Sequence, residues 1–288
     1  MTDEGRLALA LRDALQLPSR VDLQALAQEL GLSISEVDCD SFDGALLRGN
    51  NRPLGRILVK SAIREIGRKR FTVAHEIGHF MLHRERQISC SSMDIERWGS
   101  EREDPERQAD NFASELLLPS REVLKQVGNN WPSFQLITSV AEFFGTTLTA
   151  TARKYCDVAS QACALVWSVN REIRWMHPSP RFIHWVPVGQ EISSGTFAAQ
   201  VFEGKATPGE MQEVAAEEWI SSSYLLQDAV IWEQSVPMPF YRGCLSLLWA
   251  KREIVNLDHE RDELLEELDP KEFTHERTKW PGKSKRRA

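Results

Sequence analysis

Two histidines and a glutamate stand at helical spacing in the stretch from Arg70 to His83. The letters there read RFTVAHEIGHFMLH, so that His75, Glu76 and His79 form an H-E-x-x-H pattern. In an α-helix the two histidines would lie one turn apart on one face, close enough to bind one metal ion. Glu76 would lie beside them as a general base rather than as a ligand. The stretch therefore predicts a helix that carries a catalytic metal site.

A second helix, predicted over residues 105–119, supplies two further carboxylates. Pro105 stands where proline favours the start of a helix, and Glu106 and Asp110 follow four residues apart, hence on one face. Glu106 is available as a third protein ligand, which leaves a fourth position open for water. Asp110 can accept a hydrogen bond from the far ring nitrogen of a histidine ligand and so fix its tautomer. We expect His75, His79 and Glu106 to bind Zn²⁺.

Other ligand sets fit the spacing less well. The pattern H-x-x-G-x-x-H is excluded, since Leu82 and Glu85 occupy the positions that need glycine and histidine. His83 is turned by about 80° from His75 on a helix, and we expect it to cap or pack the helix end. Cys90 is the cysteine in range of the site, but it falls in a polar stretch. Glu101, Glu103 and Asp104 lie in the same predicted loop.

The composition describes an ordinary globular protein. The chain has 288 residues, 42% of them hydrophobic, a formal net charge of −7 and five cysteines without a C-x-x-C pair. The scattered basic residues argue against nucleic-acid binding, and no apolar run approaches the ~20 residues of a membrane helix. The N-terminus lacks a signal-like pattern. We expect a reduced, cytoplasmic protein that does not bind a membrane.

Helices and strands must place the two metal-binding segments. Residues 6–30 carry two helical patterns separated by Pro18, and the second is predicted to lead into a small sheet rather than into a DNA-reading helix. Residues 55–60 are predicted as a strand. This strand is a candidate edge for aligning an extended peptide, and an ordinary internal strand is the alternative.

The second half of the chain carries mainly strand patterns. Residues 162–169 and 173–176 are predicted as strands joined by an Asn170-Arg171 turn, and further strands are predicted at 230–233 and 244–250. One helical stretch is predicted near 210–218. The predicted fold class is α+β: a zincin-like metallopeptidase domain, with a small sheet and active-site helices, followed by a smaller α+β domain.

Three segments are expected along the chain. We predict the metallopeptidase domain at residues 1–158 and the second domain, with a sensing or partner-binding role, at 159–257. A short acidic helix and a basic tail without fixed structure follow at 258–288.

The two blocks together, Arg70 to His79 and Glu106 to Pro119, resemble the core of the ImmA/IrrE family of bacterial zinc metallopeptidases. The resemblance covers roughly residues 20–155. It implies that His75, His79 and Glu106 bind zinc and that Glu76 is the catalytic base. The role of Asp110 rests on its spacing, because the family frequently has asparagine there.

The leading hypothesis is a zinc endopeptidase. The resemblance implies that it cleaves a helix-turn-helix repressor of the XRE type and thereby switches on genes, in mobile elements or stress responses. One alternative is a regulatory module without proteolytic activity, in which the metal site is structural and the second domain senses a ligand or partner. Another is direct DNA binding through residues 20–37 or the basic tail.

Overall fold

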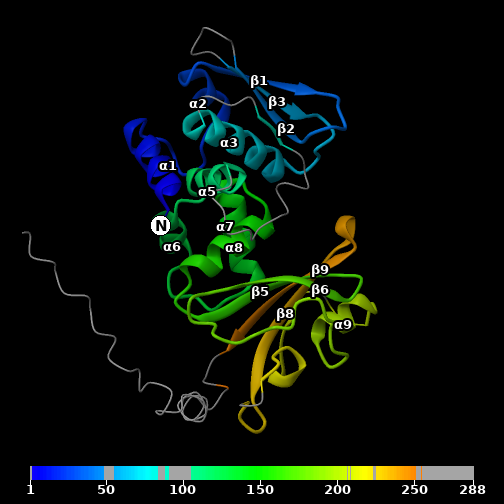
Figure 1. Cartoon of the computed structure of the whole chain (residues 1–288). Helices are drawn as coiled ribbons and strands as arrows, with labels where there is room; N and C mark the ends of the chain where they lie inside the picture. Colours follow the sequence, from blue (N-terminus) through cyan, green and yellow to red (C-terminus); the bar gives the residue numbers. More distant parts are fainter. Residues whose placement is uncertain are drawn as a thin grey trace, which may run out of the picture.

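The computed structural model shows two β-sheets with helices packed between them (Figure 1). The residues that the structure describes are 2–48, 55–83, 88–90 as backbone, 105–205, 207, 209–222, 225–250 and 254.

The first sheet and its helices form the N-terminal part of the chain. Its elements are α1 (Asp3–Ala14), α2 (Leu23–Glu29), β1 (Leu32–Val37), β2 (Gly44–Arg48), β3 (Gly55–Lys60), α3 (Ile66–Leu82) and β4 (Ile88–Cys90). Side chains that accept backbone N–H groups begin both early helices, Thr2 for α1 and Asp22 for α2. Gly31, at φ +75°, lets the chain turn from α2 directly into β1. The predicted helix leading into a small sheet is confirmed.

The strand order of this sheet is β1-β3-β2-β4. β3 runs parallel to β1 and antiparallel to β2, with Ile57 opposite both Ile34 and Leu46. It is therefore an internal strand: of the two alternatives predicted for residues 55–60, the internal strand is confirmed and the edge for a bound peptide is wrong. The burial of Ile57 and Val59 explains its place, because a strand with a strongly apolar face is used at the centre of the sheet.

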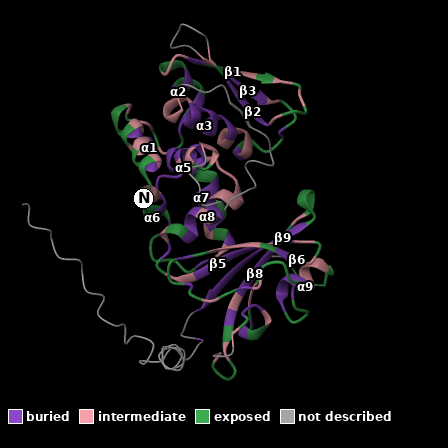
Figure 2. Ribbon diagram, viewed as in Figure 1, coloured by how far each residue is buried: buried purple, intermediate pink, exposed green. Residues whose placement is uncertain are grey.

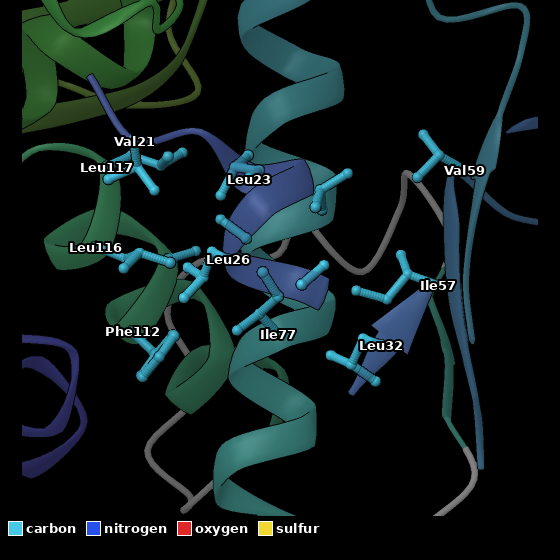
Figure 3. Packing of buried hydrophobic residues seen from close by; sticks show 14 of the residues in the cluster. Val21, Leu23, Leu26, Leu32, Ile57, Val59, Ile77, Phe112, Leu116 and Leu117 are labelled. Atoms are coloured by element: carbon cyan, nitrogen blue, oxygen red, sulfur yellow. The ribbon is translucent and has the colours of Figure 1, made fainter. Parts of the chain in front are cut away.

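The metal helix α3 lies between this sheet and helix α5 (Pro105–Leu117). Figure 3 shows Ile77 on α3 with Ile57 and Leu32 of the sheet on one side and Phe112 and Leu116 of α5 on the other. Residues 72–79 of α3 are buried without interruption. The two predicted metal-binding histidines thus sit on a helix that is fixed from both sides.

A layer of helices follows α5 and connects the two sheets. It comprises α6 (Ser120–Val127), α7 (Phe134–Phe144) and α8 (Leu148–Val158). Ser133 and Thr147 cap the starts of α7 and α8, and Gly145 ends α7 in the left-handed conformation.

The second sheet is antiparallel, in the order β6-β5-β9-β8-β7. Its strands are β5 (Ala162–Val169), β6 (Glu172–Pro178), β7 (Met211–Ala215), β8 (Val230–Met238) and β9 (Gly243–Ala250). Asn170 and Arg171 both have positive φ, as the tight hairpin predicted between β5 and β6 requires. β9 is buried along its whole length (Figure 2), because helices cover one face of the sheet and α9 (Phe197–Phe202) with the segment around Trp219 covers the other. The predicted α+β architecture is confirmed.

One helix prediction is wrong. Residues 211–215 form strand β7, and only Ala216–Glu218 make a single 3-10 turn. The local letters favour a helix, but pairing with β8 from Met211 to Ala215 decides the structure.

No helix in the described part of the chain is long and apolar enough to cross a membrane. The acidic helix and the basic tail predicted for residues 258–288 lie outside the described residues.

Candidate metal centre

The close crossing of α3 and α5 depends on a glycine between the two histidines. A Cβ atom at Gly78 would stand 3.1 Å from the Cα of Ala109, so that a larger residue would push the helices apart. Ala109 is itself small and fully buried at the crossing. The first turn of α5, which carries Glu106, is thereby held against the last two turns of α3.

Three donor groups converge where the helices cross. The Nε2 atoms of His75 and His79 lie 2.9 Å apart. A carboxylate oxygen of Glu106 lies 3.1 Å from His75 Nε2, and the other lies 3.4 Å from His79 Nε2. Within the described residues these three form a group that could hold a metal ion, with all ligand atoms within 4.8 Å of one another.

The donor set fits zinc in type and in spacing. Two imidazoles and one carboxylate are a common set for catalytic zinc, and bonds of about 2.0–2.2 Å in a tetrahedron place neighbouring donor atoms about 3.3 Å apart. The 2.9 Å between the two Nε2 atoms and the 3.1 Å and 3.4 Å from these atoms to the two oxygens of Glu106 are close to that value. One tetrahedral position is left over. Cys90, the cysteine that the sequence places in range of the site, has its side chain outside the described residues.

The opposite ring nitrogens of the histidines have partners of their own. His75 Nδ1 lies 2.8 Å from a carboxylate oxygen of the buried Asp110, which is the contact predicted from the spacing of α5. His79 Nδ1 lies 3.0 Å from Nδ1 of His83. His83 ends α3 as its C-cap, as expected, but its ring contact with His79 was not predicted. The i, i+4 spacing of these two histidines is the signal that could have indicated it.

Glu76 lies beside the ligands and against strand β2. Its side chain is fully buried, and a Cβ atom at Gly44 of β2 would approach one of its carboxylate oxygens to 2.7 Å. The missing side chain at Gly44 thus gives the carboxylate its room. Glu76 is close enough to His75 for its charge to favour the protonated form of that ring.

The pKa values of the two histidines are shifted in opposite directions. Burial lowers the pKa of a histidine, but at His75 the hydrogen bonds to Asp110 and Glu106 outweigh burial and raise its pKa to about 10. At His79 burial prevails, His75 adds to it, and the pKa is lowered. The pKa of Glu106 is lowered, because hydrogen bonds from His75 and His79 outweigh its burial. The carboxylate is therefore ready to bind a cation, whereas His75 must first lose a proton.

Comparison with known families agrees with this geometry. Residues 27–155 match the model of peptidase family M78, described as an IrrE N-terminal-like domain. This part of the chain belongs to the ImmA/IrrE metallopeptidase family. The matched residues begin in the second turn of α2 and end in α8. They include the first sheet, the metal helix α3 and helices α5 to α7. The roles of the individual site residues stay predictions.

The second sheet lies beyond the matched domain. A solved structure described as a Mycobacterium tuberculosis transcriptional regulator is similar to 91% of this chain and 78% of its own, with 12% sequence identity and a TM-score of 0.52. The match therefore extends past the IrrE N-terminal-like domain and shows a shared fold. No curated protein gives a significant match.

Proposed function

We propose that the chain is a zinc-dependent endopeptidase that cleaves a helix-turn-helix repressor of the XRE type and so releases gene expression. The observation that carries the proposal is the convergence of His75 Nε2, His79 Nε2 and the Glu106 carboxylate, with Glu76 beside them. Membership of a metallopeptidase family supports hydrolysis of a protein substrate. The substrate class rests on the resemblance, and the similarity to a transcriptional regulator agrees with it.

The residues of the chain would divide the reaction between them. His75, His79 and Glu106 would hold the ion, and Asp110 would keep His75 in the tautomer that presents Nε2. When bound, Zn²⁺ would polarise the peptide carbonyl and lower the pKa of a water molecule to about 7. Glu76 would take a proton from the attacking water and later give it to the nitrogen of the leaving amine. The peptide C–N bond breaks, and a carboxylate and an amine result.

The test is a cleavage assay with purified full-length protein. The protein is loaded with one equivalent of zinc and incubated with a helix-turn-helix repressor encoded beside it. We expect one discrete cut, which Glu76→Gln abolishes without loss of bound zinc. Glu29→Gln, on the exposed face of α2, serves as the matched control and should cleave normally. Failure to bind stoichiometric zinc, or undiminished cleavage by Glu76→Gln, would refute the proposed peptidase activity.

One observation favours a second candidate function, a regulatory module without proteolytic activity. An open pocket of about 830 Å³ lies in the second part of the chain, far along the sequence from the metal centre, and polar residues such as Gln190 and Glu217 line it together with Leu225. It suits the alternative in which this part senses a ligand. The two candidates differ in one result, because a sensing module without proteolytic activity leaves the repressor intact in the cleavage assay.

A further inference from the structure

A line of two side chains continues outward from the second histidine ligand. His79 Nδ1 lies 3.0 Å from His83 Nδ1, and His83 Nε2 lies 2.8 Å from Oε1 of Gln108. All three side chains come from the segments that carry the metal ligands, since His83 ends α3 and Gln108 is in the first turn of α5. His79 is fully buried, and the other two are half-buried.

The chemistry of the last residue sets the direction of every hydrogen in this line. An amide oxygen accepts and cannot donate, so Nε2 of His83 carries a hydrogen and donates it to Gln108. In a neutral imidazole the other nitrogen is then an acceptor, which makes Nδ1 of His83 accept from Nδ1–H of His79. With its hydrogen on Nδ1, His79 has a lone pair on Nε2, the atom that faces His75 and Glu106.

We propose that His83 and Gln108 are positioning residues, which fix His79 in the tautomer that presents Nε2 to the metal ion. This inference rests on the metal site of the proposed function. It gives the two histidine ligands unlike supports: the carboxylate of Asp110 holds His75, whereas the imidazole ring of His83 holds His79. The two supports share one geometry, in which each ligand ring donates its Nδ1–H away from the metal.

Zinc affinity of the full-length protein, measured by competition with a chromogenic chelator, tests the role of His83. His83→Leu removes the acceptor, and we expect zinc binding to weaken by about 10–100-fold. His83→Asn places an amide oxygen where Nδ1 stands and should restore affinity close to that of the unmodified protein. The matched control is His177→Leu, which removes a histidine on β6 whose Nε2 lies 2.7 Å from a carboxylate oxygen of Asp157. It should not change zinc affinity.

The role of Gln108 is tested by combining substitutions. Gln108→Leu should weaken zinc binding when His83 is present, because the tautomer of His83 is then no longer fixed. The same change should have little effect beside His83→Asn, since an amide oxygen needs no tautomer to be chosen. Equal effects in both backgrounds would show that Gln108 does not act through His83 and would overturn its assignment.

A direct readout of the tautomer does not depend on affinity. Long-range ¹H–¹⁵N spectra of zinc-loaded protein labelled at its seven histidines report which ring nitrogen carries hydrogen. The signal that disappears in His83→Asn belongs to His83, and we expect its hydrogen on Nε2. A hydrogen on Nδ1 of His83 would overturn the proposal.

The possible failures are distinguishable. If the unmodified protein binds no zinc, the proposed function fails and this inference falls with it. If it binds zinc but His83→Leu binds equally well, or His83→Asn binds as poorly as His83→Leu, the positioning role alone is wrong. Thermal unfolding of the metal-free variants separates weakened binding from a damaged fold, and His83→Asn keeps the question open to test should His83→Leu not fold.

Discussion

At the scale of single residues, the site is arranged by what each side chain touches on the side away from the metal. Asp110 contacts His75, His83 contacts His79, and Gly44 leaves room for the carboxylate of Glu76. The grouping of His75, Glu76 and His79 could be predicted from the sequence, because helical spacing fixes residues about one turn apart. The approach of Glu106 on α5 was expected from its place on a second helix and from the resemblance, and the structure brings its carboxylate to both rings. The contact of His83 with His79 had a signal in their i, i+4 spacing, but the contact of Gly44 with Glu76 had none, because it depends on which strand lies opposite the helix.

The raised pKa of His75 predicts a pH-dependent affinity for zinc. Below pH 10 zinc must displace a proton from His75, so apparent affinity should rise about tenfold per pH unit from pH 7 to 9. Glu106, with its lowered pKa, stays ionised over this range. Competition titrations at fixed free zinc measure the slope. Asp110→Asn removes the charge that raises the pKa of His75, and its slope should be flatter. A flat profile for the unmodified protein would contradict the assignment.

Gly44→Ala should damage catalysis while sparing metal binding. The new methyl group would stand 2.7 Å from Glu76 Oε1 and 2.5 Å from Thr72 Cγ2, and the flexible carboxylate is the group that can move away. We expect kcat/KM for repressor cleavage to fall by about 10²-fold, as a 1 Å misplacement of a reacting group can cause. Zinc affinity should be unchanged.

A second variant isolates the contact with Glu76. Thr72→Ser removes the Thr72 methyl group and keeps the hydroxyl that donates to the Arg68 carbonyl. Gly44→Ala combined with Thr72→Ser should remain as impaired as Gly44→Ala alone. Recovery of activity in the double variant would show that Thr72, and not Glu76, is displaced.

At the scale of elements, the sequence predicts correctly those helices and turns that depend on residues close together in the chain. The Asn170-Arg171 hairpin and the helix around His75 follow from turn chemistry and helical periodicity, and the structure has both. The local sequence predicts a helix where β7 forms and does not decide between an edge and an internal strand for β3, because strand pairing joins residues far apart in sequence. The tight α3–α5 crossing likewise depends on Gly78 meeting Ala109 across 31 positions of chain.

A buried carboxylate ties the elements of the second sheet together. Glu233 on β8 accepts hydrogen bonds from the backbone N–H groups of Phe197 and Ala198, from Trp219 Nε1 and from Ser235. Glu233→Gln turns an NH₂ group toward at least one of these donors. We expect unfolding free energy to fall by about 1–3 kcal/mol, measured by urea unfolding. Glu213→Gln, exposed on the neighbouring β7, is the control and should unfold as the unmodified protein does.

At the scale of the whole molecule, one apolar core joins the helical layer to the second sheet. Phe144 and Tyr155 pack with Leu165 and Leu247 in a single cluster. Arg153 of α8 also lies 4.0 Å over the ring of Trp175 on β6. The sequence indicated the order of the two parts, but not this shared layer, because an apolar helix face does not reveal its partner. The predicted boundary after residue 158 stays a prediction.

Because of the shared core, we predict that a fragment of residues 1–158 is less stable than the full chain. Without the second sheet, the faces of α7 and α8 that carry Phe144 and Tyr155 would be exposed to water. We expect the fragment to bind a dye for exposed apolar surface and to melt at a lower temperature. A fragment with the melting temperature and zinc affinity of the full chain would show that the first part is independent of the second.

The central claim is that His75, His79 and Glu106 bind one metal ion. Crystals of the zinc-loaded full chain, measured at the zinc absorption edge, test it most directly. The account predicts one anomalous peak within about 2.0–2.2 Å of Nε2 of both histidines and of a Glu106 oxygen, with Glu76 not bonded to it. A peak held by other side chains, or a Glu106 that points away from both rings, would contradict it.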